Sequence, residues 1–143
     1  MLRKEAGDSL FHAIIQQFYK EYGGKNADTD DFKRVSEDIS GKNLSQFFKQ
    51  WLYAEENPRL KISWKYKVAD NTIRLTVKQL QQSTFAFPLE IFVQFTNGVS
   101  SLQRITINQK VETFALPAAE RPLNIIADPN ACLLFEGNIT EEK

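Results

Sequence analysis

The sequence predicts an α+β protein in which about three N-terminal helices precede a seven-stranded, immunoglobulin-like β-sandwich. Two observations support this fold class. Apolar residues recur with helical spacing as far as Leu52, and from Leu60 they alternate with polar residues, as in strands with one buried face. Asn57-Pro58 lies between the two patterns, where proline ends a helical region.

These patterns divide the chain into three expected parts. Residues 1–57 form a helical segment, residues 58–137 form a β-sandwich domain, and residues 138–143 form a polar, frayed tail.

The first full helix carries an apolar stripe that is too wide to be covered by two small neighbouring helices, and it ends at Gly23-Gly24. Residues before Gly7 are interpreted as the last turns of a further helix. We expect part of the stripe to stay exposed and to mediate self-association. The residues of this possible exposed face are Leu10, Phe11, Ile14, Ile15 and Phe18.

The next two helices have recognisable ends. Asp28 to Asp31 supply the capping and acidic side chains that a helix start favours, and Gly41 can close that helix in the left-handed conformation. Asn43 is the expected N-cap of the last helix, whose apolar residues share one face and are expected to be buried: Leu44, Phe47, Phe48, Trp51 and Leu52. Packing between the helical and sandwich parts is assigned to Phe47, Phe48, Trp51, Leu52, Pro58 and Trp64.

Alternation with a period of two predicts seven short strands, with Val68 on the inner face of the first. Asp70-Asn71 and Asn97-Gly98 are expected hairpin turns, and Asp128-Pro129-Asn130 separates the last two strands. The expected strands cover residues 60–68, 73–77, 85–95, 102–107, 111–116, 123–127 and 132–135.

Composition narrows the classes of partner. Eighteen basic and eighteen acidic residues balance, so neither nucleic acid nor an anionic membrane surface is an expected partner. No apolar run is long enough to span a membrane. A secretion signal would need an apolar segment where the sequence has Arg3, Lys4 and Glu5. The localisation is left open. Cys132 is the one cysteine, which excludes an internal disulfide.

The run Ser-Gly-Lys-Asn-Leu-Ser-Gln-Phe-Phe-Lys-Gln-Trp-Leu-Tyr at 40–53, followed by Asn57-Pro58 and a strand with aromatic residues, resembles a segment of the aminopeptidase N family of gluzincin zinc metallopeptidases. Met1-Leu2-Arg3 with Gly7-Asp8 and Phe11, and Asp31-Phe32, are also similar to motifs of that family. The resemblance implies the end of the helical catalytic domain followed by its small β-sandwich. It also implies zinc and peptide-bond hydrolysis from the N-terminus of peptides in the parent protein, and the upstream catalytic domain as a partner.

The residues themselves offer no catalytic or metal site. A zincin site needs two histidines one helical turn apart, and His12 is the only histidine. Asp28, Asp30 and Asp31 lack the glycine and glutamate of a calcium loop and are interpreted as caps. Trp64 and Tyr66 could stack on a ligand but are in phase with core residues. No cofactor is therefore expected in this chain.

Two interpretations remain open. The chain is a non-catalytic C-terminal piece of a zinc aminopeptidase-like enzyme that supports the catalytic domain. Alternatively, it is an independent immunoglobulin-like module with a helical cap that binds protein or glycan, since the fold alone does not decide function. Whether it belongs to an enzyme is left uncertain at this point.

Overall fold

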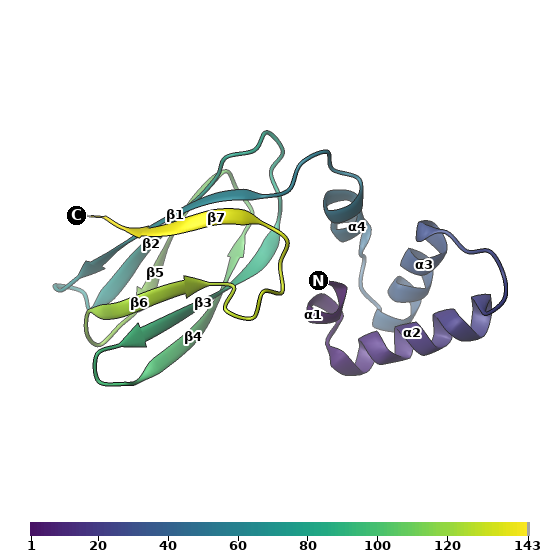
Figure 1. The fold of residues 1–143 in the computed structure, drawn as a ribbon, viewed down its shortest axis with the longest axis horizontal. Helices are drawn as coiled ribbons and strands as arrows, with labels where there is room; N and C mark the ends of the chain where they lie inside the picture. The colour runs from purple at the N-terminus through teal and green to yellow at the C-terminus, as the bar shows by residue number, and fades with distance from the viewer. Residues whose placement is uncertain (143) are drawn as a thin grey trace. The chain divides into compact units, whose positions relative to one another are not determined.

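The computed structural model describes residues 1–142 and separates the chain into two compact units, Met1–Glu55 and Glu56–Lys143. We call them the helical unit and the sandwich unit (Figure 1). Helices are confined to the first and strands to the second, so the predicted α+β class is confirmed.

The helical unit has one short helix followed by three longer ones. They are α1 (Leu2–Ala6), α2 (Asp8–Tyr22), α3 (Thr29–Ser40) and α4 (Ser45–Leu52). Gly7 has a φ of 91° and separates α1 from α2, which places the break where the sequence predicted it.

Local chemistry explains the ends of α3 and α4. Asp28 and Asp31 form a capping box, in which each carboxylate accepts the other's backbone N–H at 3.0 and 3.1 Å. Gly41 ends α3 in the left-handed conformation, with a φ of 66°. The expected cap of α4 is shifted by one residue, because Leu44 is the N-cap and the Asn43 side chain accepts from the Ser45 N–H at 2.9 Å.

The core of the helical unit is small. Aromatic rings connect its helices, since Phe32 meets Phe18 edge-on at a centroid distance of 5.1 Å and Phe48 at 6.3 Å. Ile14, which we expected on the exposed face, has no exposed surface, because it lies on the side of α2 that faces the unit's interior. The buried apolar side chains of this unit are Ala6, Ile14, Val35, Leu44 and Phe48.

The sandwich unit consists of two sheets, with strand orders β5-β2-β1-β7 and β4-β3-β6 (Figure 1). The strands are β1 (Arg59–Lys67), β2 (Thr72–Gln79), β3 (Phe87–Phe95), β4 (Ser100–Ile107), β5 (Val111–Pro117), β6 (Pro122–Ala127) and β7 (Glu136–Glu141). Alternate residues of β1, β2 and β3 are buried, as their period of two predicted. Val68 is an exception: it lies beyond the end of β1 and is 76% exposed.

The end of the chain differs from the prediction. Residues 132–135 do not form a strand, and the seventh strand is β7, which includes most of the expected frayed tail. β7 pairs in parallel with β1, from Arg59 opposite Glu136 to Trp64 opposite Glu141. Its side chains are largely exposed, so hydrogen bonding rather than apolar burial holds it, and no alternation marks it in the sequence.

The order of strands also departs from the constant-type immunoglobulin sandwich. In that order the seventh strand lies beside the sixth. Here β7 lies beside β1, and within residues 1–142 β6 pairs with β3 alone. A two-sheet sandwich is thus established, and the specific immunoglobulin-like arrangement stays a prediction.

Two buried glutamines organise the loop between β2 and β3. Gln79 donates to the carbonyls of Phe85 and Gln109, both at 2.9 Å, and its oxygen accepts from the Phe85 N–H at 3.0 Å. Gln81 donates to the Gln79 oxygen at 2.6 Å and accepts from the Arg59 N–H at 2.9 Å. Because both side chains are at most 3% exposed, these bonds replace the water that the loop backbone would otherwise need.

Candidate functional site

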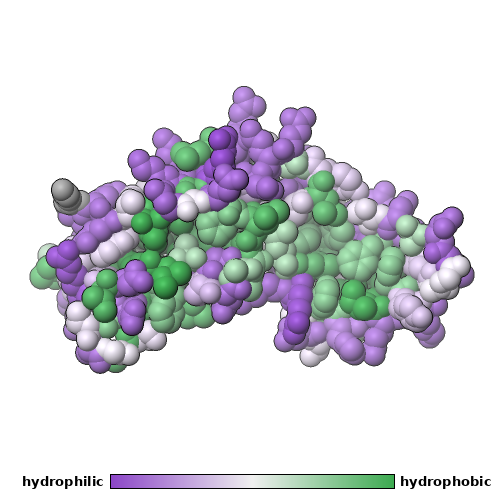
Figure 2. All heavy atoms as spheres, viewed as in Figure 1, coloured by the Kyte–Doolittle hydropathy of each residue, from purple (hydrophilic) through white to green (hydrophobic). Residues whose placement is uncertain are grey.

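The helical unit contains an apolar hollow of about 510 Å³ between the start of α3 and one face of α4. Apolar side chains are visible at the surface over this unit in Figure 2. The residues that line the hollow are Met1, Leu2, Ala27, Asp28, Thr29, Phe32, Phe47, Phe48, Trp51 and Leu52. We call this feature the helical hollow.

The face of α4 supplies the largest side chains of the helical hollow. Phe48 is buried at 4% exposure, whereas Phe47 and Trp51 are half-buried and Leu52 is 57% exposed. The expectation that all the apolar residues of this helix are buried is therefore wrong for this chain. The other three helices do not present enough surface to cover both sides of α4, and open apolar surface of this kind commonly marks a contact site.

A polar network links α2 to α3. The Tyr22 hydroxyl donates to Asp31 Oδ1 at 2.7 Å and accepts from Arg34 at 2.8 Å, and Arg34 also pairs with Glu21. The hydrogen bond from Tyr22, together with the backbone N–H of Asp28, lowers the pKa of the Asp31 carboxyl below its usual value. This network fixes the start of α3, and with it one wall of the helical hollow.

The other residues assigned to packing between the two parts lie outside the helical hollow. Pro58 and Trp64 are buried, and Trp64 is 7% exposed on β1 of the sandwich unit. On α2, Leu10 and Ile15 are 38% and 43% exposed, while Phe11 and Phe18 are half-buried. Self-association through α2 stays a prediction.

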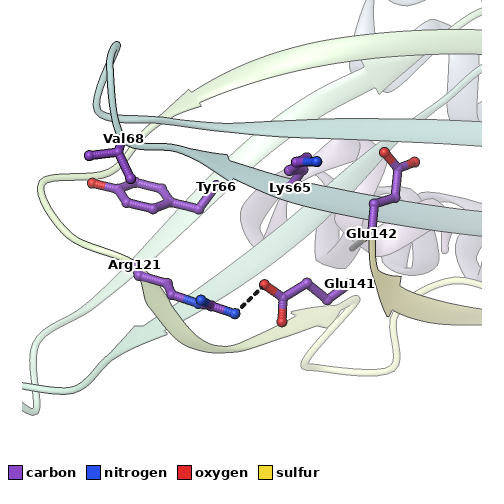
Figure 3. Close-up of a pocket in the computed structure, with 6 residues that line it drawn as sticks. All are labelled: Lys65, Tyr66, Val68, Arg121, Glu141 and Glu142. Atoms are coloured by element: carbon purple, nitrogen blue, oxygen red, sulfur yellow. Dashed lines mark hydrogen bonds and ion pairs between the residues drawn. The ribbon is translucent and has the colours of Figure 1, made fainter.

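A second hollow, of about 610 Å³, lies on the sandwich unit and has mixed charge (Figure 3). Arg121 points to Glu141 across it, with a nitrogen to oxygen distance of 2.7 Å, and the pair is largely exposed. An exposed ion pair of this kind contributes little stability. Tyr66 supplies an aromatic wall and donates to Asn71 at 3.2 Å. The remaining lining residues are Lys65, Val68 and Glu142.

Sequence reasoning missed part of both hollows. Ala27 lies in the loop before α3 and Arg121 in the loop before β6, so neither belongs to a periodic pattern. Arg121 and Glu141 are twenty residues apart and meet only because β7 returns to β1. The motif that contains Phe47, Phe48 and Trp51 marked α4 as an apolar face, but it predicted a buried face and not an open hollow.

Among residues 1–142, no three histidine, cysteine, aspartate or glutamate side chains lie close enough together to hold a metal ion. His12 is exposed and its Nε2 lies 3.0 Å from the Gln16 amide nitrogen. Within the same residues, no helix combines the length and apolar character that crossing a membrane requires.

A helical unit with an open apolar face, followed by a seven-stranded sandwich, defines the class of α+β architecture to which the chain belongs. Two comparisons with known proteins match this chain to parts of aminopeptidases. The chain is 29% identical over 104 residues to glutamyl aminopeptidase of Bitis rhinoceros, a match that covers 71% of this chain and 11% of that protein. No family model matches the chain.

A solved structure shows the same fold. The crystal structure of Legionella pneumophila aminopeptidase A in complex with aspartic acid matches 96% of this chain, with a TM-score of 0.81 and 17% sequence identity. The chain spans 16% of that structure. These comparisons confirm the resemblance to aminopeptidases that the motifs predicted: the chain is similar to a small part of such enzymes.

Proposed function

We propose that this chain is a non-catalytic, C-terminal part of a zinc aminopeptidase-like metallopeptidase, and that the helical hollow receives the catalytic domain. The observation that carries the proposal is the position of the matching motif. Phe47, Phe48 and Trp51, which resemble the family's aromatic run, line an open apolar surface rather than a closed core. Such a surface suits a permanent contact with a neighbouring domain.

In this proposal the chemistry belongs to the parent protein. There, zinc would polarise the scissile carbonyl and lower the pKa of the attacking water, so that peptides are hydrolysed from their N-terminus. The present residues would add support to the catalytic domain, because packing on the helical hollow would fix the orientation of α3 and α4.

The first test uses the chain alone. After dialysis, elemental analysis is expected to find no stoichiometric zinc, and aminoacyl reporter substrates are expected to remain intact. Bound zinc together with chelator-sensitive peptidase activity would contradict the proposed non-catalytic role.

The second test asks whether the helical hollow binds a catalytic domain. The coding sequence upstream of Met1 is read for an H-E-x-x-H motif, and the encoded segment is produced as a separate polypeptide. We expect it to bind the chain, and Trp51→Asp to abolish binding while Lys49→Asp, on the exposed side of α4, does not. A stop codon immediately upstream, or equal binding by both variants, would contradict the proposal.

The mixed-charge hollow of the sandwich unit favours a second candidate function, an independent protein- or glycan-binding module. Tyr66 offers an aromatic surface, and Arg121 and Glu141 offer hydrogen bonds to hydroxyl groups. Glycan binding that is lost in Tyr66→Ala and kept in Tyr53→Ala, a 62% exposed tyrosine outside this hollow, would support the module instead.

A further inference from the structure

The strand β6 lies at the edge of its sheet and forms a ladder only with β3 in the part of the chain that the structure describes. The Asp128 N–H donates to the Glu90 carbonyl at 2.8 Å at one end of this ladder. Because hydrogen-bonded and non-hydrogen-bonded pairs alternate in an antiparallel ladder, the backbone groups of Ile125 and Ala127 point to the open side of β6. Such an edge is a template for another strand.

A groove without charged residues lies beside β6 and could accept an uncharged strand. Because β7 pairs with β1, a groove of about 320 Å³ is left where residues of β6 and β7 approach, and none of its lining residues is charged. Its apolar walls come from both sheets and from the loop before β7, and they include Ile62, Ile125, Phe135 and Ile139.

The four edge strands of the two sheets differ in charge. Arg104 lies on β4, Glu112 on β5, and Glu136 and Glu141 on β7. The sequence of β6, Pro-Leu-Asn-Ile-Ile-Ala, has no charged residue. Charged residues and proline on an edge are common protections against pairing, and from Leu123 to Ala127 β6 has neither.

This difference matters most for pairing between identical strands. Two copies of an antiparallel edge related by a two-fold axis bring like residues close together, and like charges that face each other destabilise the pair. β6 avoids this repulsion. It also exposes Leu123 and Ile126, at 61% and 40%, which a second strand would partly cover.

We propose that two copies of this chain associate by antiparallel pairing of their β6 strands, which joins their three-stranded sheets into one continuous sheet. The open-side backbone groups place the two-fold axis at Ile125, with Leu123 of each copy opposite Ala127 of the other. The contact uses the same surface on both copies, so association stops at the dimer.

Sedimentation equilibrium of the full chain over a range of concentrations tests the proposal. We expect a monomer–dimer equilibrium that Ile126→Lys weakens by about tenfold or more, because the substitution enters the contact twice. Leu102→Lys is the matched control, since Leu102 is 54% exposed on the opposite edge of the same sheet, and it should leave the equilibrium unchanged. Ile15→Asp on α2 should also leave it unchanged.

Amide hydrogen exchange identifies the edge directly. The N–H groups of Ile125 and Ala127 should become protected as the protein concentration rises, while that of Ile126, already directed to β3, should not change. A strictly monomeric chain, an open-ended polymer, dissociation by Ile15→Asp alone, or a dimer with Ile125 and Ala127 still unprotected would each overturn the proposal.

Discussion

The two units differ in how completely they bury their own apolar side chains. In the sandwich unit, facing sheets enclose Leu75, Leu89 and Ile91 without any exposed surface. In the helical unit, few side chains are buried, and Leu52 and Tyr53 of the α4 region are 57% and 62% exposed. Two sheets can complete a core by themselves, whereas a few short helices leave open faces. The sandwich unit thus completes an apolar core within itself, whereas the helical unit leaves apolar surface open.

The largest expected effect is on the free energy of unfolding, and it tests whether the sandwich unit encloses its own core. Leu75→Ala removes a fully buried side chain and should lower the free energy of unfolding of the sandwich by about 2–5 kcal/mol. Leu102→Ala, the same change at a 54% exposed position, should stay within about 0.5 kcal/mol. Urea denaturation measures both, followed by tryptophan fluorescence in a Trp51→Phe background that leaves Trp64 as the single tryptophan. Similar losses in the two variants would mean that the sandwich core is not enclosed as described.

A smaller effect is expected in the polar part of the same core. Gln81→Ala removes the acceptor of the Arg59 N–H and one of the two donors to the Gln79 oxygen, and an unsatisfied buried group typically costs about 1–3 kcal/mol. Gln82→Ala alters an exposed side chain in the same loop and should have little effect. Thermal unfolding of the two variants checks this, and equal melting temperatures would show that the glutamine pair does not hold the loop.

On the helical side, Trp51→Ala should affect binding more than stability. Full truncation of a buried tryptophan costs about 3–5 kcal/mol, but Trp51 is only half-buried, so we expect a loss of about 1 kcal/mol. The variant should still fail to bind an upstream catalytic domain, because it removes a large aromatic side chain from the lining of the helical hollow. Lys49→Ala should change neither property. A loss of several kcal/mol in the isolated chain would place Trp51 in a closed core instead.

The parts of the fold that the sequence predicted are those whose residues carry their own local signal. The stripe on α2, the capping box at Asp28 and the turn glycine Gly41 each depend on neighbours within a few residues. The strands β1 to β3 bury one face, so their alternation locates them. The spacing of the aromatic run likewise predicted the helix α4, although not that part of its apolar face is open.

The parts that were missed depend on distant segments. β7 is held by its ladder with β1, and its exposed side chains show no apolar alternation. The burial of Ile14 and the exposure of Leu52 are set by the arrangement of four helices, since both residues lie on apolar stripes in the sequence. Arg121 meets Glu141 only in the folded sheet. Local sequence patterns predict which face of a helix or strand is apolar and which neighbouring residues cap a helix. They do not predict which apolar faces stay uncovered in the folded chain.

The smallest expected effect concerns the polar network that links α2 to α3. The hydrogen bond from Tyr22 is the main cause of the lowered pKa of Asp31, so Tyr22→Phe should raise that pKa towards the usual aspartate value of about 4. A carboxyl whose pKa is lower in the folded state stabilises that state above its unfolded pKa, and the contribution disappears as the pH falls through the folded value. The helical unit should therefore lose stability below about pH 4, and Tyr22→Phe should reduce this dependence of stability on pH.

Tyr19→Phe, at a 78% exposed position on the same helix, is the control. Carboxyl-carbon NMR titration of Asp31 gives the measurement, and an unchanged pKa in Tyr22→Phe would mean that the backbone N–H of Asp28, rather than the Tyr22 hydroxyl, sets the acidity of this group.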